Sequence, residues 1–420
     1  MLKNILKSVT DVPRPNYENR QRNLDFSFEE NAIISIYPEI KEEIINQQLI
    51  YHQQFPDLKY RFSKLLDYHL KLDPKYLARA VFLVHAYRLL EKPSLLNEIN
   101  IRKASILGWC HKMHDASVLL DDDIADASDT RYNKPTWYTL PDIGVNKAIF
   151  DSAFLKTGAN FLILNYLSSH PQCINIQKSL LISYSMTNVS QLFEIQQFKM
   201  EEIEKYQNVL KFYQFALPLI SSALYLANID DKNIHAAVHE TCIEIAEFQK
   251  IQDDVACVFG SISDTQKSCT DVSEGRPSWL AMEAYKRGDE GQRKILEKHY
   301  GVNNKESVAN VYKVFRQLKL KEAYDEFQKD FYEEMHFKIH NKLPKSLPPK
   351  LFMDLLDSSM SGRFRLQRLY NKIQTSVLKK TGNDLVNSHI AKRLENPKLN
   401  NELQPVIKAV FGFDDRRNDL

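Results

Sequence analysis

The chain has 420 residues, of which 43% are hydrophobic and only 11 are glycine, so it can bury a large core and favours long helices over turn-rich β structure. A formal net charge of +2 excludes a strong overall field for nucleic acid. No apolar run approaches the roughly 20 residues that span a bilayer. We therefore expect neither nucleic acid nor a membrane span.

Three regions are expected along the chain. Residues 1–25 form a polar lead-in, residues 26–365 the main helical domain, and residues 366–420 a helical C-terminal extension. The first nine residues, MLKNILKSV, are basic and amphipathic, which is typical of a mitochondrial transit peptide, but they are poor in arginine and acidic residues soon follow. The expected location is cytoplasmic, with a mitochondrial one as the alternative.

Within the main domain, the hydrophobic periodicity and the prolines predict the helices. Amphipathic helices occupy the stretch from Phe26 to Leu95, and one long helix runs from Ile101 to Ala127. Residues 128–145 form a loop. Further helices cover 146–168, 172–200, 202–228 and 232–258, and after a polar loop at 260–277 helices resume at Trp279.

The cysteines and two histidines suggest no structural metal or disulfide. Five cysteines are an odd number, and none forms a Cys-x-x-Cys pair, so free thiols in a reducing compartment are expected. His111 and His114 share one helical turn, but no third ligand has a suitable spacing for zinc.

An acidic segment near the end of the helix 101–127 carries the strongest chemical signal. Asp122, Asp123 and Asp126 stand at positions i, i+1 and i+4, which lie close to one helical face. Their mutual repulsion, several tenths of a kcal/mol per pair, is relieved by a hard cation, and Mg²⁺ prefers oxygen ligands. A solvated acidic surface remains the alternative for such a cluster taken alone.

A second acidic pair and several cations strengthen the Mg²⁺ hypothesis. Asp253 and Asp254 follow on another predicted helix, and Arg131, Lys267 and Arg276 lie in the loops after the two acidic segments. Two carboxylate clusters with nearby cations suit the binding of a diphosphate through several Mg²⁺ ions. The allylic carbocation left by a departing diphosphate needs a dry, aromatic-lined cavity, for which the 22 Phe and 20 Tyr offer candidates.

These segments resemble a known family. DDIADASDTRYNKPTWY is similar to the first aspartate-rich motif of the trans-isoprenyl diphosphate synthases, especially the farnesyl diphosphate synthase group. IQDDVACVFG and TDVSEGRPSW resemble the second motif and its basic loop, and the similarity covers roughly residues 50–365. It implies an all-α isoprenoid-synthase-type bundle of antiparallel helices around a central cavity, usually a homodimer. An allylic prenyl diphosphate is the implied substrate and Mg²⁺ the implied cofactor, with three ions and with Mn²⁺ as an alternative.

The resemblance also assigns roles to residues. It implies metal ligands at Asp122, Asp123, Asp126, Asp253 and Asp254. It implies diphosphate-binding residues at Arg131, Gln191, Lys267 and Arg276, and catalytic roles for Arg131 and the first three aspartates. The sequence departs from the family at Cys257, which replaces the last Asp of the second motif, and at Glu194, where an Asp is usual. The segment from Leu210 to Pro218 is about one helical turn shorter than in the family.

The larger departures affect the second substrate, isopentenyl diphosphate. In the family it binds a Gly-Gly-Lys-x-x-Arg segment, a Gln before the first aspartates and the second Arg of an Arg-Arg-Gly. Here Tyr76 stands at the lysine position, Asp115 at the glutamine and Tyr132 at the second arginine; Arg79 is kept, and Lys75 is a substitute after a one-residue shift. These losses should weaken binding by several kcal/mol, at roughly 1.5–3 kcal/mol per charged hydrogen bond.

These departures predict an enzyme that ionises an allylic diphosphate but has no isopentenyl diphosphate to condense with the cation. The cation must then cyclise, lose a proton or capture water, which is the chemistry of terpene synthases. The pattern is most similar to the insect terpene synthases derived from farnesyl diphosphate synthases, which make volatile terpenes such as pheromones. The leading hypothesis is therefore a lyase that converts an allylic diphosphate, farnesyl diphosphate first, into a sesquiterpene. One alternative is a farnesyl or geranyl diphosphate synthase with an altered isopentenyl pocket. Another is an inactive regulatory subunit, which Cys257 and the shortened helix would suit.

Overall fold

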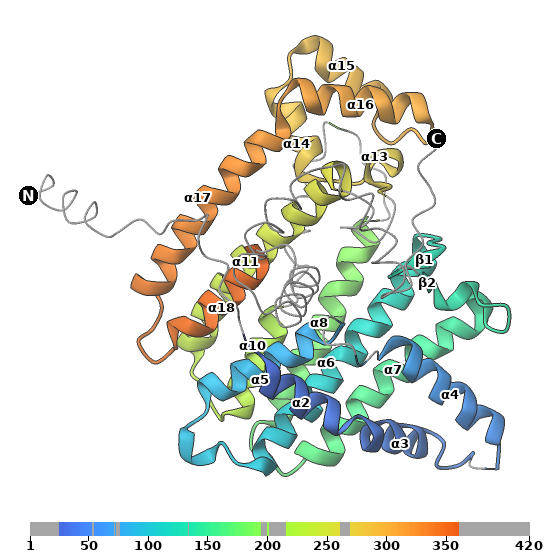
Figure 1. The fold of residues 1–420 in the computed structure, drawn as a ribbon, viewed down its shortest axis with the longest axis vertical. Helices are drawn as coiled ribbons and strands as arrows, with labels where there is room; N and C mark the ends of the chain where they lie inside the picture. The colour runs from blue at the N-terminus through green and yellow to red at the C-terminus, as the bar shows by residue number, and fades with distance from the viewer. Residues whose placement is uncertain are drawn as a thin grey trace, which may run out of the picture. The chain divides into compact units, whose positions relative to one another are not determined.

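The computed structural model describes residues 25–360, apart from residues 53, 71, 73–75, 133, 195–199, 201–215 and 261–268 (Figure 1). The chain divides into two units, Met1–Gly362 and Arg363–Leu420, and all of the described residues belong to the first. The expected C-terminal extension and nearly all of the expected lead-in lie outside the described residues, so the predicted domain limits stay predictions.

Helices dominate the described part of the chain, and the all-α prediction is confirmed. The α-helices are α2 (Ser27–Ser35), α3 (Tyr37–Gln48), α4 (Pro56–His69), α5 (Ala78–Leu90), α6 (Glu98–Ala125), α7 (Gly144–Leu167), α8 (Cys173–Glu194), α10 (Ala216–Leu226), α11 (Lys232–Phe259), α13 (Asp271–Glu274), α14 (Trp279–Arg287), α15 (Glu290–His299), α16 (Lys305–Gln317), α17 (Leu320–Asn341) and α18 (Pro349–Met360). Two 3₁₀ turns, η3 (Pro93–Leu95) and η4 (Trp137–Thr139), and two short strands, β1 (Thr130–Arg131) and β2 (Lys134–Pro135), complete the described elements.

Helix α6 is central to the packing, because it contacts α2, α5, α7, α8 and α10. It begins after Asn97, whose side chain accepts a hydrogen bond from the backbone N–H of Asn100 at 3.0 Å. Its middle is fully buried, and the Trp109 indole N–H donates to the carbonyl of Ile33 in α2 at 3.0 Å. Since α6 ends with the acidic segment, the same packing fixes the position of the aspartates.

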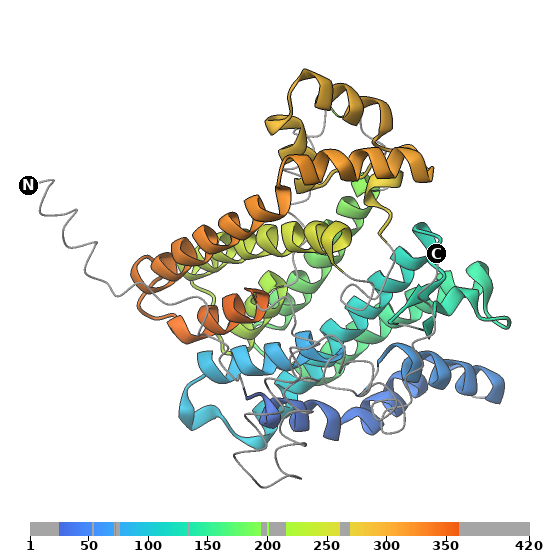
Figure 2. The ribbon, with the colours of Figure 1, turned by 45° about the horizontal axis from the view of Figure 1, so that its top comes forward.

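Helix α11 carries the second acidic pair. It starts after Asp231, whose carboxylate accepts from the backbone N–H groups of Asn233 and Ile234 at 2.8 and 3.1 Å. It packs against α10, α14, α17 and α18. Both views show α17 and α18 beside α11, with α14, α15 and α16 gathered at one end of α17 (Figures 1 and 2). The basic loop after α11 leads into this second group of helices.

The observed limits of α6, α7 and α11 lie within three residues of the predicted ones. Residues 195–199 of the helix expected over 172–200, and residues 202–215 of the one expected over 202–228, lie outside the described residues. The helix expected from Ile101 to Ala127 spans Glu98–Ala125, and that expected over 232–258 spans Lys232–Phe259. Two expected loops contain regular structure. The loop over 128–145 holds the antiparallel pair β1–β2, with Thr130 opposite Pro135 and Arg131 opposite Lys134, and the loop over 260–277 holds α13. Both elements are too short to give a periodic signal.

A buried polar cluster ties α18 to α2 and α5. His85 Nδ1 lies 3.2 Å from Glu29 Oε1, and its Nε2 lies 2.8 Å from Asp354 Oδ2. Arg88 pairs with Glu29 and Lys350 with Asp354. Burial acts to lower the pKa of His85, but the two carboxylates raise it. Burial likewise acts to raise the pKa values of Glu29 and Asp354, but their cationic partners lower them.

None of the helices in the described part of the chain is both long and apolar enough to cross a membrane.

Candidate active site

The first aspartate-rich segment lies at the C-terminal end of α6. Asp122 and Asp123 belong to the last turn, and Asp126 is the residue at which the helix ends. The guanidinium of Arg131, in β1, donates from Nη2 to Asp122 Oδ2 and from Nε to Asp123 Oδ1, each at 2.5 Å. These contacts bring together three of the residues that the sequence predicted to act on a diphosphate.

The β1–β2 pair turns Arg131 back toward the helix that it follows. Thr136 closes the turn, because its backbone N–H donates to Asp129 O at 2.9 Å and its Oγ1 donates to Ser128 O at 2.7 Å. Between the strands, Tyr132 adopts a positive φ of 55°, which is unusual for a residue with a Cβ atom. The same hairpin thus carries both Arg131 and Tyr132.

Arg276 reaches this cluster from a distant part of the sequence. Its Nη2 donates to Asp126 Oδ1 at 2.5 Å, and its Nε donates to Glu274 Oε2 at 2.7 Å. The side chains of Arg276 and Asp126 are 13% and 8% exposed, so water screens their ion pair only weakly. The contact joins the loop behind the second acidic helix to the first aspartate cluster.

A close backbone approach holds the Arg276 turn in place. Gly275 ends α13 with a φ of 70°, and a Cβ atom there would lie 2.9 Å from the Cα of Gly301, which also has a positive φ. Gly301 N–H donates to Val272 O at 2.9 Å, and the neighbouring Tyr300 hydroxyl donates to Arg276 O. The two backbone segments can therefore approach this closely only because neither glycine carries a Cβ atom.

Burial and crowding make the aspartate cluster a suitable cation site. Burial raises the pKa of Asp123 to about 6, against the opposing charge of Arg131, and the nearby Asp122 and Asp126 add repulsion. Although burial opposes it, the pKa of Arg131 is raised by the carboxylates of Asp123 and Asp122. Carboxylate oxygens are the ligands that Mg²⁺ prefers, so the donor set of these aspartates fits Mg²⁺.

The two aspartates of α11 have different surroundings. Asp253 is exposed, whereas Asp254 is buried. Asp254 accepts from the backbone N–H of Trp279, at the start of α14, at 2.8 Å and pairs with Lys250 at 3.3 Å. Burial raises its pKa to about 7. The structure directs Asp254 toward α14, and the metal-binding roles predicted for Asp253 and Asp254 stay predictions.

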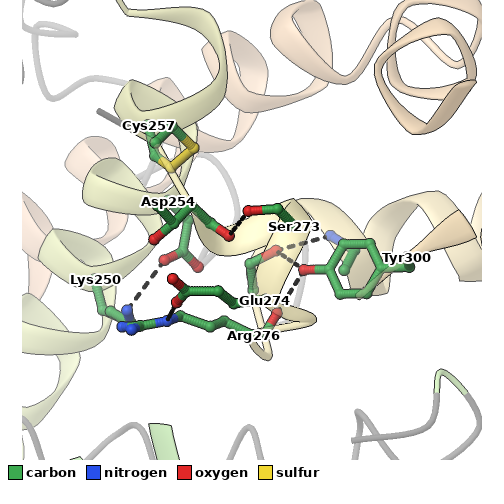
Figure 3. The surroundings of a disulfide bond; sticks show 11 residues. Lys250, Asp254, Cys257, Ser273, Glu274, Arg276 and Tyr300 are labelled. Carbon is green, nitrogen blue, oxygen red and sulfur yellow. Dashed lines mark hydrogen bonds and ion pairs between the residues drawn. A yellow bond between two sulfur atoms is a disulfide. The ribbon is translucent and has the colours of Figure 1, made fainter. Parts of the chain in front are cut away.

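The expectation of free thiols is wrong at two positions. Cys257, in the last turn of α11, and Cys269 form a disulfide with their Cα atoms 5.0 Å apart (Figure 3). Sequence spacing carries no pairing signal outside recognised motifs, so only the fold reveals this contact. In the described part of the chain, the two sulfurs and the Asp271 carboxylate are the only set of three candidate metal ligands within 4.8 Å of one another, but sulfurs in a disulfide offer no thiolate. The free cysteines are Cys110, Cys173 and Cys242, all buried.

The remaining predicted residues are only partly placed. Gln191 lies in α8, and its Oε1 is buried without a hydrogen-bond partner in the described part of the chain. Lys267, Lys75 and the side chain of Glu194 lie outside the described residues. The segment from Leu210 to Pro218 is described only from residue 216 onward. The predicted roles of these residues stay predictions.

The two histidines of α6 do not converge on one point. His111 Nε2 lies 2.9 Å from Ser222 Oγ in α10, while the His114 ring packs against Tyr184 in α8 with centroids 3.6 Å apart. Burial lowers the pKa of each histidine to about 3, which keeps both rings neutral at physiological pH.

The positions that correspond to the family's isopentenyl pocket contact one another here. The rings of Tyr76 and Tyr132 pack with centroids 4.8 Å apart. Arg79, in α5, forms an ion pair with Asp115 of α6, and Lys112 Nζ lies 3.5 Å from the other oxygen of that carboxylate. Aromatic contact thus replaces two cations of the pocket, and Asp115 engages the third.

Sequence reasoning missed three supporting residues. Lys250 forms an ion pair with Asp254, and Lys112 forms one with Asp115. The Tyr300 hydroxyl donates to the Arg276 carbonyl. Lys250 and Lys112 stand four and three residues before their partners, a spacing that signals a helical ion pair. Tyr300 lies 24 residues from Arg276 in an unrelated segment, so the sequence holds no signal for it.

Comparison with known proteins shows the family to which the chain belongs. The Polyprenyl synthetase family model matches residues 59–318. Farnesyl pyrophosphate synthase of Mus musculus is 30% identical over 349 residues, which cover 80% of this chain and 97% of the relative. The corresponding enzyme of Murgantia histrionica is 28% identical, with 77% and 80% covered, and the bifunctional chrysanthemol synthase of Tanacetum cinerariifolium is 28% identical, with 74% and 79% covered.

The helical fold and the aspartate–arginine site define an isoprenoid-synthase type of protein, and the chain belongs to the polyprenyl synthetase family. The resemblance of its motifs to the trans-isoprenyl diphosphate synthases is thereby confirmed.

Proposed function

We propose that the chain is a class I terpene synthase that ionises an allylic prenyl diphosphate, farnesyl diphosphate first, and releases a sesquiterpene and diphosphate. The observation that carries this proposal is the state of the second-substrate positions. Tyr76 packs on Tyr132, and Arg79 pairs with Asp115, where the resembling synthases bind isopentenyl diphosphate. A second diphosphate would meet a carboxylate and two phenols in place of cations.

The ionising side, in contrast, keeps its charges. Arg131 and Arg276 are two guanidinium groups beside the carboxylates of the first cluster, and each is suited to bidentate binding of a phosphate. Asp122, Asp123, Asp126 and Asp253 would hold Mg²⁺, which when bound supplies positive charge at the diphosphate. Asp254 would support this site indirectly, through its hydrogen bond to Trp279.

The chemistry follows from that arrangement of charges. Heterolysis of the allylic C–O bond sends the electron pair to the diphosphate, where Arg131 and Arg276 offset the growing negative charge. The allylic cation left behind has no second substrate to attack, so it cyclises or rearranges and then loses a proton or captures water. A dry site is needed until that step.

A prenyltransferase is the second candidate, because the relatives favour it. Those cited include two farnesyl pyrophosphate synthases, and one of them matches over 97% of its own length. On this view, Lys75 or another cation replaces the lost anchors of isopentenyl diphosphate. The two candidates differ in one measurable property, which is the use of a second diphosphate.

A homodimer is proposed from two apolar stripes. Ile174 and Leu181, and likewise Ile182 and Val189, stand seven residues apart on α8 and are exposed. Helix α7 adds exposed apolar side chains, of which Phe150 is 75% exposed. Monomers rarely expose adjacent apolar side chains on this scale, so we propose that a second copy of the chain covers them, as the family resemblance implies.

Product analysis tests the proposed function. The purified chain is incubated with C10, C15 and C20 allylic diphosphates and Mg²⁺, each with and without isopentenyl diphosphate, and products are separated by gas chromatography. A hydrocarbon or terpene alcohol from farnesyl diphosphate, unchanged by isopentenyl diphosphate and abolished by EDTA, is expected. Longer prenyl diphosphates as the only products would establish the prenyltransferase instead.

A further inference from the structure

The disulfide links the second acidic helix to the segment that carries Arg276. Cys257 lies three residues after Asp254, and Cys269 lies two residues before α13 (Figure 3). The bond therefore fixes the start of α13 beside the end of α11, whatever path residues 261–268 take. A cross-link over a separation of 12 residues greatly restricts the positions that its ends can adopt.

The stretch between Cys269 and Arg276 is held by its own hydrogen bonds. Glu274 N–H donates to Thr270 O and Arg276 N–H donates to Asp271 O, each at 2.9 Å. This stretch contains a single helical turn and a tight glycine turn, with little freedom to absorb a displacement. The stretch has two anchors: the Gly301 backbone and the Tyr300 hydroxyl hold its end at Arg276, and the disulfide holds its start on α11. Loss of the second anchor would alter the position of the Arg276 guanidinium relative to Asp126.

Arg276 is the point at which that displacement would affect the site. Its guanidinium lies 2.5 Å from Asp126 Oδ1, in the first aspartate cluster. An arginine fork binds a phosphate well only when its position is accurate, because the two hydrogen bonds are directional. The route from α11 through the disulfide and α13 thus ends on a proposed diphosphate ligand.

The other cysteines do not compete for the cross-link. Cys110 and Cys242 are fully buried, and burial raises the pKa of both thiols, which suppresses the reactive thiolate. Cys173 is also buried, at the start of α8. Cys257 and Cys269 are each half-buried and adjacent, so thiol–disulfide exchange is selective for this pair.

We propose that Cys257 and Cys269 form a redox-responsive positioning pair, in which the disulfide holds Arg276 against the first aspartate cluster and its reduction weakens diphosphate binding. This rests on the proposed function only in taking Arg276 as a diphosphate ligand. Glutathione disulfide is the oxidant: the two thiols lose two protons and two electrons as the new S–S bond forms, and the S–S bond of glutathione disulfide breaks on taking them up, so that two molecules of glutathione leave.

Binding measurements on the full chain test the proposal without using turnover. The protein is equilibrated in glutathione buffers of defined potential, the thiols are counted by alkylation and mass spectrometry, and calorimetry measures the affinity for inorganic diphosphate with Mg²⁺. Three free thiols and tight binding are expected after oxidation, and five free thiols with binding roughly tenfold to a hundredfold weaker after reduction, the loss of one charge-assisted contact.

Variants show whether the effect passes through the stated residues. Cys257→Ser and Cys269→Ser should bind as weakly as the reduced protein at every potential, whereas Cys173→Ser should keep the redox dependence. Arg276→Met should bind weakly and show no redox dependence. Equal affinity in the oxidised and reduced wild type, or a redox dependence that persists in Arg276→Met, would overturn the proposal. Because no product is measured, these outcomes are independent of whether a terpene is released.

Discussion

Replacing Asp115 with glutamine and Tyr132 with arginine together is expected to create affinity for isopentenyl diphosphate. In the structure, the Asp115 carboxylate engages Arg79, so a neutral amide releases that guanidinium for a phosphate. The Tyr132 change exchanges an aromatic contact with Tyr76 for a second guanidinium. Position 132 has a φ of 55°, and because tyrosine and arginine are both unbranched at Cβ, the exchange adds no backbone strain.

The size of the gain follows from the two cations. Each charge-assisted hydrogen bond contributes about 1.5–3 kcal/mol, so two give roughly 3–6 kcal/mol. At about 1.4 kcal/mol per decade, affinity rises by roughly 10²- to 10⁴-fold. Isothermal titration with isopentenyl diphosphate measures the affinity directly, and incorporation of labelled isopentenyl diphosphate into longer prenyl diphosphates measures the gained condensation.

A matched control separates local geometry from net charge. Asp121→Gln with Tyr138→Arg makes the same chemical changes, but Asp121 pairs with Lys156 of α7 rather than with Arg79. This control should gain nothing. The reasoning fails if the wild-type chain already binds isopentenyl diphosphate as tightly as the Asp115 and Tyr132 variant, or if the control gains equally.

Three further outcomes are expected. The cluster of His85, Glu29 and Asp354 should stabilise the fold most between pH 4.5 and 6.5, which are the ordinary pKa values of Glu29 and His85. Above this range the free energy of unfolding should decline as His85 loses its proton, and below it as the two carboxylates gain protons. Urea unfolding at a series of pH values measures both declines. Gly275→Ala should lower the melting temperature, because an alanine at this positive φ costs about 1–2 kcal/mol. It should also lower the affinity for diphosphate, because its Cβ atom would meet the Gly301 backbone. Ile182→Asp should give a monomer in light scattering.

Each of these outcomes has its own control. His85→Gln should remove the decline on the alkaline side, and a wild-type stability that is flat with pH would contradict the account. Gly144→Ala places an alanine at a similar positive φ, 72°, where the space around the added Cβ atom is open. The protein should lose only the strain energy, and its affinity for diphosphate should not change. Ile295→Asp removes an exposed apolar side chain from α15 and should leave the oligomeric state unchanged.

The long helices were predictable because each carries its own signal. The 3.6-residue periodicity and the scarcity of glycine located α6 and α11 to within three residues at either end. The β1–β2 pair and α13 were not predicted, since elements of two and four residues depend on tertiary contacts such as Gly275 against Gly301. Local sequence does not record such contacts.

The site was predictable where charge and spacing agreed. The spacing predicted that Asp122 and Asp123 lie close together, and the motif resemblance pointed to Arg131, which pairs with both. The resemblance also pointed to Arg276, which pairs with Asp126 from 150 residues along the chain. The orientation of Asp254 was not predictable, since neighbouring aspartates on one helix point in different directions. The partnership of Cys257 and Cys269 depends on the return path of a loop, which composition does not determine.

The contact between Tyr76 and Tyr132 also bears on how such a site can change over generations. A lone arginine at position 132 would lose its ring partner while Asp115 still occupied Arg79 and repelled an incoming anion. A lone glutamine at position 115 would leave Arg79 without its counter-ion and with one cation too few for a diphosphate. Each change alone would supply one of the two cations at the cost of a native contact, so under the proposed function both are needed for isopentenyl diphosphate to bind. The tyrosine pair and the ion pair thus form two separate contacts, and both must change before a second diphosphate would meet two free cations.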